Sequence, residues 1–305
     1  MNKNKIAAIV VTFNRLNHLK NVVQCIREQT DISCDIVVID NGSTDETPAW
    51  LTSTENSDLI VFSQENIGGA GGFNRGVKEV YHLGYEYFWL MDDDVYPEKN
   101  ALYELMNASS KLDNKYGFLA SMVRGINGNP VNIPGISKGM NPNTGYADWL
   151  DNIEDIGIKL ESATFVSIVM NRHVISQIGL PIKDLFIWYD DSEYTLRAAK
   201  IYPGYLVASS LVYHKRGIEK TITIQNEENP NRIKMHFYSI RNAIFLVKVT
   251  SKSFGMRFIR ISWFISRNMV EILHWKTKYK GLKLKILFRA ASKGIWFNPK
   301  IESIS

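Results

Sequence analysis

Cysteine is scarce in this sequence of 305 residues, and long uncharged apolar runs are missing. Two cysteines, Cys25 and Cys34, are too few for the disulfide framework of a small secreted protein. The Met1–Lys5 start is not followed by the apolar h-region of a secretion signal. A spanning helix needs about 18 uncharged apolar residues, and the longest uncharged runs, 125–137 and 201–214, are broken by glycine and proline. We therefore expect a reduced, cytoplasmic protein without a spanning segment.

The charge of the chain is unevenly distributed. The composition, 45% hydrophobic and 22% charged residues, is that of a globular protein, and the net charge is only +5. Residues 231–305 hold 16 Lys or Arg and two acids, a net charge of +14, so residues 1–230 carry −9. This asymmetry suggests that the basic part faces an anionic surface, either membrane or nucleic acid. We predict two parts, 1–230 and 231–305.

Short apolar runs alternate with amphipathic stretches in the first hundred residues. The apolar runs, which favour strands, are 6–11, 36–39, 59–62 and 87–91. Helices are predicted between them at 16–28, where apolar residues have helical spacing, at 47–51, where Thr47 and Pro48 start a helix, and at 73–82. This alternation predicts an α/β fold with a parallel sheet covered by helices.

Polar segments follow each predicted strand. They are Thr12–Arg15, Asp40–Asp45, Glu65–Gly76 and Asp92–Asp94. In an open parallel sheet, ligands bind beyond the carboxyl ends of the strands, so these segments should share one edge. Carboxylates, a glycine-rich loop entering a helix and Arg75 together indicate a site for a nucleotide and its metal ion. Each segment alone is also typical of a solvated turn, because Asp, Asn and Gly form turns.

The glycine-rich segment is not one of the common nucleotide motifs. Gly68, Gly69, Gly71 and Gly72 allow close backbone approach, and the following helix N-terminus could cradle phosphate. The segment lacks the Lys-Ser/Thr of a P-loop, and it does not follow the first strand as a dinucleotide fingerprint would. A kinase-like or NAD-binding protein therefore has little support.

Three consecutive aspartates end the fourth predicted strand. Alternate strand residues point the same way, so Asp92 and Asp94 should converge while Asp93 turns off. Two convergent carboxylates repel unless a cation joins them, and oxygen ligands suit Mg²⁺ or Mn²⁺ bridging a diphosphate. The alternative, an N-cap cluster for a helix near Glu98, explains one aspartate but not three. His214 ends a later β-like run and could supply a third ligand, although a lone histidine is usually structural.

A second acidic cluster follows an aromatic run. Asp190, Asp191 and Glu193 come directly after Trp188 and Tyr189. A carboxylate partly walled by aromatic rings has the setting of a general base. The same residues are typical of a helix N-terminus, where acids cap and favour the dipole, and both interpretations can hold at once.

Six motifs, in this order along the chain, resemble those of the family 2 inverting glycosyltransferases with the GT-A fold. They are Val10–Asn14, Val38–Asp45, Asn66–Gly76, Trp89–Asp94, Trp188–Tyr194 and Val212–His214. The resemblance is strongest to galactofuranosyltransferases and related rhamnosyltransferases of bacterial surface-polysaccharide synthesis. One departure is Tyr189, where the galactofuranosyl branch is expected to carry Trp directly before the Asp pair. The resemblance implies a GT-A fold with a mixed, mainly parallel sheet and a C-terminal helical region.

The resemblance also implies roles for individual residues. The nucleotide-sugar would contact Thr12, Asn14, Asp40, Asn66, Gly68, Gly69, Arg75 and Asp93. Mn²⁺ or Mg²⁺ would be held by Asp92, Asp94 and His214. Asp190 would be the catalytic base, with Asp191 beside it. The acceptor would contact Trp188, Tyr189, Glu193 and Arg241, the last of these in the segment His236–Asn242, which is similar to an aromatic-x-x-Arg-Asn element of this branch.

The implied function is transfer of a sugar, with inversion, to a hydroxyl of a lipid-linked or polysaccharide acceptor. UDP-galactofuranose is the donor that fits the resemblance best, and dTDP-rhamnose is the alternative. Two interpretations of another class stay open: a nucleic-acid-binding protein and a catalytically inactive sugar-nucleotide-binding module. The acidic rim would repel phosphate in the absence of metal, so we expect no nucleic-acid partner.

The basic tail, 231–305, is mostly helical by pattern. Lysines and arginines gather in 276–293 among Leu, Ile and Phe, a composition typical of an interfacial helix on anionic lipid. The alternatives are a helical subdomain packed on the catalytic core and a homodimer contact. We expect a protein peripheral on the inner face of the plasma membrane, where a lipid-linked acceptor would lie.

Overall fold

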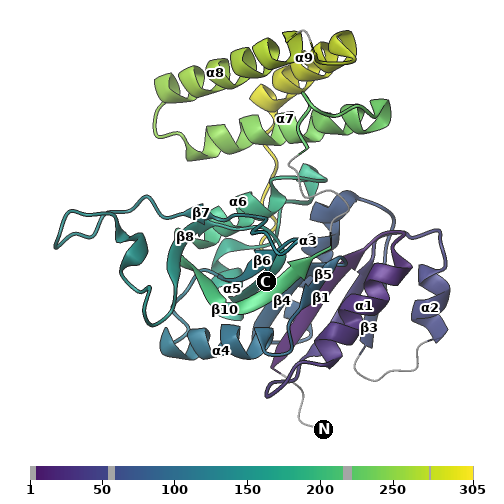
Figure 1. Ribbon diagram of the computed structural model, residues 1–305, viewed down its shortest axis with the longest axis vertical. Coiled ribbons are helices and arrows are strands. Elements are labelled where there is room, and N and C mark those ends of the chain that lie inside the picture. The colour runs from purple at the N-terminus through teal and green to yellow at the C-terminus, as the bar shows by residue number, and fades with distance from the viewer. Residues whose placement is uncertain (1–4, 54–58, 216–221, 275, 305) are drawn as a thin grey trace. The chain divides into compact units, whose positions relative to one another are not determined.

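The computed structural model describes residues 5–53, 59–215, 222–274 and 276–304 (Figure 1). Contacts divide the chain into two compact units. The sheet unit comprises Met1–Lys183, Asp190–Glu219 and Ile301–Ser305, and the helical unit comprises Asp184–Tyr189 and Lys220–Lys300.

The sheet unit is built on a mixed sheet that has ten strands within the described residues. The strands are β1 (Ile6–Thr12), β2 (Asp35–Asp40), β3 (Leu59–Ser63), β4 (Tyr87–Asp92), β5 (Val95–Pro97), β6 (Leu119–Arg124), β7 (Gly135–Ile136), β8 (Ile158–Ser162), β9 (Val166–Asn171) and β10 (Gly204–His214). Their order is β3-β2-β1-β4-β9-β6-β10-β8-β7, with β5 beside β10. Strands β1 to β4 pair in parallel, whereas β9 is antiparallel to both of its neighbours. The predicted mixed sheet is confirmed.

Helices cover both faces of this sheet (Figure 1). They are α1 (Leu16–Arg27), α2 (Thr47–Ser53), α3 (Gly68–His82), α4 (Ala101–Lys111), α5 (Arg172–Ile178) and α6 (Asp190–Ala198), with short 3-10 turns at Asp148–Leu150 and Lys183–Leu185. All seven residues of β1 are buried, because side chains on its two faces enter two different cores. Ile9 packs in a core with residues of α3, α5 and α6, and Val10 packs in a core with residues of α1 and α4. A strand covered on both faces has a continuous apolar sequence for this reason.

Helix α3 begins at Gly68, five residues before the predicted start at residue 73. The glycines expected in a phosphate-binding loop therefore lie inside the helix. A Cβ at Gly72 would come within 2.4 Å of the Val11 side chain, and one at Gly76 within 2.5 Å of Ile9. These glycines let α3 pack closely on β1, a packing role that the sequence pattern did not distinguish from a loop.

The helical unit contains α7 (Pro230–Thr250), α8 (Phe254–Leu273) and α9 (Lys280–Trp296), which confirms the predicted C-terminal helical region. The Asn229 side chain accepts hydrogen bonds from the backbone N–H of Asn231 and Arg232, and Pro230 fits the first turn of α7. The three helices share a core of aliphatic residues, among them Ile240, Ile272 and Leu287.

The last described residues, 301–304, belong to the sheet unit. The Glu302 carbonyl accepts a hydrogen bond from the Leu180 N–H at 2.9 Å, and its carboxylate lies 2.7 Å from Lys78 Nζ on α3. Ile304 is buried in the core that contains α3 and α6. Truncation of the chain before residue 301 would therefore remove part of the sheet unit's own packing.

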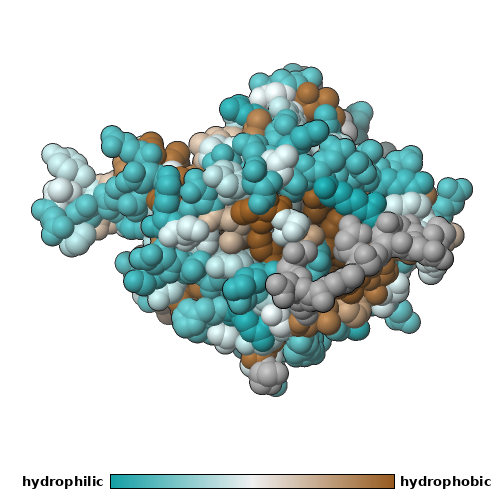
Figure 2. Space-filling view, turned by 90° about the horizontal axis from the view of Figure 1, so that it is seen from below, coloured by the Kyte–Doolittle hydropathy of each residue, from teal (hydrophilic) through white to brown (hydrophobic). Residues whose placement is uncertain are grey.

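Hydrophilic residues cover most of the face of the molecule in Figure 2, and a smaller group of apolar residues lies near its middle. Within the described ranges, every helix is too short or too polar to cross a membrane.

Candidate active site

The carboxyl ends of β1, β2 and β4 lie side by side, as the order of the polar segments predicted. Thr12 at the end of β1 pairs in register with Asp40 at the end of β2, and Val11 pairs with Asp92 at the end of β4. Thr12 and Asp40 are buried. Parallel pairing thus brings residues that are 28 to 80 positions apart to one edge of the sheet.

A group of potential metal ligands lies at this edge. One ligand atom from each of Asp92, Asp94 and His214 lies within 4.8 Å of the others. The antiparallel pairing of β5 and β10 aligns His214 with Val95, directly after Asp94. His214 Nε2 lies 2.9 Å from Asp94 Oδ1. The predicted convergence of Asp92, Asp94 and His214 is therefore seen in the geometry.

Negatively charged carboxylates crowd together in this cluster, which fits a cation site. Burial and then the charges of Asp94 and Asp93 raise the pKa of Asp92 well above its ordinary value. Burial would also raise the pKa of Asp94, but His214 and Arg15 lower it to about 2. Two carboxylates and an imidazole are a donor set that Mn²⁺ or Mg²⁺ can use, and a bound cation would relieve the repulsion that Asp92 experiences.

Asp93 is not part of the group of potential metal ligands. Strand alternation is not the reason, because β4 ends at Asp92, and Asp93 and Asp94 lie in the turn before β5. Asp93 Oδ2 accepts a hydrogen bond of 2.7 Å from Thr12 Oγ1, and its Oδ1 accepts one of 3.1 Å from Arg15. Arg15 also donates to Asp94 Oδ2 at 2.7 Å, so one guanidinium joins two neighbouring carboxylates. No individual role was assigned to Arg15 from the sequence. Its position directly after Asn14, beyond the end of the first strand, could have indicated one.

The residues assigned to the nucleotide form a hydrogen-bonded rim on two loops. Asn14 Oδ1 accepts from the backbone N–H of Thr44 at 2.6 Å, and Asp40 Oδ1 accepts from that of Ser43 at 2.9 Å. Asn14 adopts a φ of +53°, which asparagine tolerates better than most residues. An open depression of about 800 Å³ is lined by Asn14, Arg15, Leu16, Asn17, His18, Thr44, Asp45 and Glu46. It is large enough to receive part of a nucleotide.

The other residues assigned to the nucleotide lie around the start of α3. Asn66 Oδ1 accepts the Gly68 N–H at 3.0 Å. Among the described residues, a Cβ at Gly69 would meet no atom within 4 Å apart from its chain neighbours and the backbone of its own helix. Arg75 is 2.6 Å from Glu79 one turn later on the same helix. The backbone at Gly69 is thus accessible, whereas Arg75 already has an acidic partner.

The two candidate catalytic carboxylates begin α6. Asp190 is 7% exposed, and burial followed by the charge of Asp191 raises the pKa of Asp190 to about 8. Burial also raises the pKa of Asp191, to about 6. Both aspartates contribute to the raised pKa of Asp92, so the two acidic groups lie within electrostatic range of each other. These residues start a helix, as one of the two interpretations predicted; Asp190 is buried, Asp191 is half-buried, and the pKa of each carboxyl is raised.

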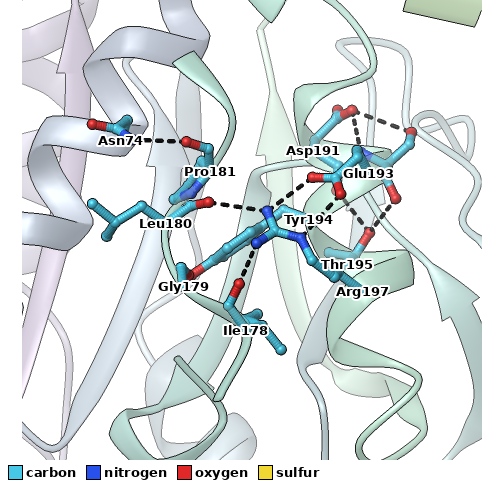
Figure 3. Close-up of polar contacts among 11 residues, drawn as sticks. Asn74, Ile178, Gly179, Leu180, Pro181, Asp191, Glu193, Tyr194, Thr195 and Arg197 are labelled. Carbon is cyan, nitrogen blue, oxygen red and sulfur yellow. Dashed lines mark hydrogen bonds and ion pairs between the residues drawn. The ribbon is translucent and has the colours of Figure 1, made fainter. Parts of the chain in front are cut away.

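Glu193 is held in an ion pair rather than left free for an acceptor (Figure 3). Its two carboxylate oxygens accept hydrogen bonds of 3.0 and 2.9 Å from Arg197. Arg197 also donates to the carbonyls of Ile178 and Leu180, which fixes α6 against the turn that follows α5. Asn74 on α3 donates to the Pro181 carbonyl of the same turn at 2.8 Å. In this arrangement Glu193 stabilises the position of α6.

Trp188, Tyr189 and Arg241 belong to the helical unit, where α7 holds the aromatic run. Trp188 stacks on His236 with ring centroids 5.2 Å apart, and Arg241 donates to the carbonyl of Asp184 at 2.7 Å. Trp188 and Tyr189 have φ values of +65° and +67°, in the left-handed region that costs bulky residues about 1–3 kcal/mol each.

Asn242, the last residue of the segment His236–Asn242, stabilises this strained run. Its fully buried side-chain amide donates to the carbonyls of Leu185, Ile187 and Trp188 at 2.9, 3.1 and 2.9 Å. The segment was expected near the acceptor, but the sequence did not reveal that Asn242 acts on a backbone more than 50 residues away.

Asn132 is a residue that the sequence did not indicate at all. Its Oδ1 lies 2.8 Å from His214 Nδ1. Asn132 lies outside the six motifs, and its partner is 82 residues away along the chain. No local signal could therefore have found it.

A mixed α/β sheet with buried carboxylates at the carboxyl ends of its parallel strands is the arrangement of a GT-A sugar-nucleotide transferase. Residues 7–156 match the family model described as Glycosyl transferase family 2. This part of the chain is therefore a family 2 glycosyltransferase domain, as the resemblance implied.

Curated relatives match over a limited stretch. The chain is 30% identical over 92 residues to the galactofuranosyltransferase GlfT1 of Mycolicibacterium smegmatis, which is 30% of each protein. It is 32% identical over 111 residues to an uncharacterized glycosyltransferase of Rickettsia prowazekii, covering 36% of this chain and 33% of that protein. The match thus spans about a third of the length of these relatives.

Solved structures share the fold over nearly the whole chain. TarS residues 1–349 of S. aureus, in complex with UDP-GlcNAc, has a TM-score of 0.57 at 14% identity and covers 94% of this chain and 81% of that one. The mannosyltransferase PcManGT of Pyrobaculum calidifontis, in complex with GDP-Man and Mn²⁺, has a TM-score of 0.53 at 15% identity, with coverage of 96% and 88%. The GT-A fold with a C-terminal helical region is confirmed.

Proposed function

We propose that this chain is a metal-dependent inverting glycosyltransferase that moves a sugar from a nucleotide-diphospho-sugar to an acceptor hydroxyl. The observation that carries the proposal is the buried acidic edge, where Asp92, Asp94 and His214 gather within electrostatic range of Asp190. The family 2 domain supports the reaction class. Nucleotide-sugar complexes of proteins with the same fold support the type of donor.

The residues around the carboxyl ends of the parallel strands would contact the donor. We assign nucleotide and sugar contacts to Thr12, Asn14, Asp40, Asn66, Gly68, Gly69, Arg75 and Asp93. The open depression beside Asn14 would receive part of the nucleotide. Arg15 already neutralises Asp93 and Asp94, and it would be available to a diphosphate once a metal ion holds Asp94.

We assign the metal to Asp92, Asp94 and His214. When bound, Mn²⁺ or Mg²⁺ would neutralise the charge that develops on the diphosphate leaving group. Asn132 would orient His214 by holding Nδ1, which leaves Nε2 directed at the cluster.

Asp190 would accept the proton of the acceptor hydroxyl as the oxygen attacks the anomeric carbon. Its raised pKa makes it a stronger base than an ordinary carboxylate. A single displacement inverts the configuration and needs no covalent enzyme intermediate. Asp191 would order the acceptor, together with Trp188, Tyr189 and Arg241, whereas Glu193 would hold α6 through Arg197.

The finer assignment is galactofuranose from UDP-galactofuranose, with dTDP-rhamnose as the alternative donor. The similarity to GlfT1 over part of the chain supports the first donor. The acceptor would be a lipid-linked oligosaccharide of surface-polysaccharide synthesis. Residues 1–230 would carry the chemistry, and residues 231–305 would hold the enzyme on the inner face of the plasma membrane.

A donor panel tests the proposal. The full chain with Mn²⁺ is given UDP-galactofuranose, dTDP-rhamnose and UDP-GlcNAc, each with a synthetic lipid-linked acceptor, and products are identified by mass spectrometry. We expect one donor to give a product of inverted anomeric configuration, lost when the metal is chelated. Nucleotide-sugar binding without transfer or hydrolysis of any donor would instead indicate an inactive binding module.

A further inference from the structure

Helix α8 has two apolar faces, and in the described residues only one of them has a partner. The inner face places Ile261, Ile265 and Ile272 against the core shared with α7 and α9. On the opposite face, Ile259, Trp263 and Val270 are 69%, 61% and 66% exposed. We call these three residues the α8 stripe. Their spacing of four and seven residues places them on one side of a helix of 3.6 residues per turn.

Arginines flank the α8 stripe. Arg260 and Arg267 are three residues before and four residues after Trp263, so both are its neighbours on the helix surface. Arg267 lies 5.3 Å from the centre of the Trp263 ring, and it also pairs with Glu271 at 2.9 Å. Tryptophan beside arginine is typical of the boundary between lipid headgroups and acyl chains.

The surrounding sequence carries charge of one sign. Residues 252–300 contain 12 Lys or Arg and a single acid, Glu271, a net charge of +11. A second copy docked through the same face would bring two such positive surfaces together. An anionic lipid surface complements both the charge and the exposed apolar side chains.

We propose that α8 lies in the plane of an anionic lipid surface, with Ile259, Trp263 and Val270 inserted among the acyl chains and Arg260 and Arg267 at the headgroups. This inference rests on the proposed membrane attachment and specifies the face that makes it. It requires no spanning helix, which agrees with the lengths and composition of the described helices.

Co-sedimentation of the full chain with vesicles tests the α8 stripe. The vesicles are phosphatidylcholine with or without phosphatidylglycerol, and the variants are Ile259→Gln and Trp263→Gln. The matched control is Ile133→Gln, because Ile133 in the sheet unit is also 69% exposed. We expect each stripe variant to bind anionic vesicles about tenfold more weakly, through loss of buried apolar surface, and the control to bind like the wild type.

Arg260 and Arg267 allow an independent test of the same inference. Replacing Arg260 or Arg267 by glutamine should weaken binding about fivefold on anionic vesicles only, and added salt should remove that difference. Circular dichroism checks that each variant keeps its helices. Equal vesicle binding by wild-type and stripe variants would overturn the inference. So would a wild-type dimer that Trp263→Gln converts to monomer with unchanged vesicle binding, since the stripe would then serve a second copy.

Transfer to a water-soluble acceptor separates this inference from the proposed activity. Stripe variants should transfer to such an acceptor at the wild-type rate. Transfer without any stripe-dependent vesicle binding would contradict the lipid inference alone. Stripe-dependent vesicle binding by a chain that transfers no sugar would leave the inference standing and contradict the proposed activity.

Discussion

In the sheet unit, Asp93, Asp94 and Asp190 are 4%, 6% and 7% exposed, whereas in the helical unit the side chains of Arg267 and Lys278 are 59% and 64% exposed. Buried charges change their protonation behaviour, because desolvation and neighbouring charges act in full. Exposed charges act through long-range attraction, which dissolved salt screens. We therefore propose that the two units use charge in different ways: the sheet unit for chemistry at a site, and the helical unit for contact with an anionic surface.

Replacing Asp190 by asparagine should produce the largest effect. Loss of a general base is expected to lower kcat by about 10²–10⁴-fold while donor affinity changes little. Turnover and donor titration calorimetry in Mn²⁺ measure the two quantities. Asp184→Asn is the control, because Asp184 is an exposed aspartate near Asp190 in the sequence. Near-wild-type turnover by Asp190→Asn would contradict Asp190 as the general base and make Asp191 the next candidate.

The metal cluster should respond to Asn132, which touches His214 but is not itself in the cluster. Asn132→Ala frees His214 to rotate, and we expect Mn²⁺ affinity to fall about 10- to 100-fold. Asn132→Asp keeps an acceptor oxygen and should retain most of the affinity. Electron paramagnetic resonance of free Mn²⁺ gives both values. An unchanged Mn²⁺ affinity of Asn132→Ala would indicate that His214 does not bind the metal.

Asn242 tests whether the helical unit contributes to acceptor binding. Asn242→Ala removes three hydrogen bonds from the strained run 185–188, and we expect the acceptor KM to rise about tenfold with the donor KM unchanged, since each bond contributes about 1 kcal/mol. Asn268→Ala, on α8, is the control for simple loss of stability, because the hydrogen bonds of Asn268 to Gln225 and Phe264 lie within the helical unit. Equal rises in both KM values, or the same shift in Asn268→Ala, would contradict a role at the acceptor.

The smallest effect concerns stability and pH. The pKa of Asp190 is raised from 3.8 to about 8 in the folded protein, so its contribution to stability is present at low pH and is lost as pH rises through about 8. The Asp190→Asn variant does not lose stability in this way, because asparagine does not ionise. Without metal, we expect its Tm to exceed that of the wild type at pH 8 by about 2–4 °C for each kcal/mol gained, and to equal it near pH 4. A constant difference across this pH range would contradict a buried, raised Asp190.

Much of the site could be predicted from local pattern. Thr12, Asp40 and Asp92 each end an apolar run, and parallel pairing then brings them to one edge. The prediction from strand alternation gave the right separation of Asp93 for the wrong reason, because Asp93 and Asp94 lie in the turn after β4. Local pattern could not predict interactions between distant elements. Examples are the hydrogen bond from Arg15 to Asp94 and the one from Arg197 to the turn after α5.

The glycine segment shows why the predicted start of α3 was wrong. Gly72 satisfies a phosphate-loop pattern and a close-packing pattern equally well in sequence, because both patterns need a residue without Cβ. The Val11 side chain decides between them, and it lies beside Gly72 only once β1 and α3 are packed.

The sequence by itself determined the alternation of strands and helices, the family 2 motifs and the separation of acidic from basic regions, because period, residue type and charge are local properties. The tertiary structure decided which carboxylates are buried together, which arginines neutralise them and which face of α8 is left exposed. Those properties depend on desolvation and on side chains brought close from distant positions, and packing alone creates them.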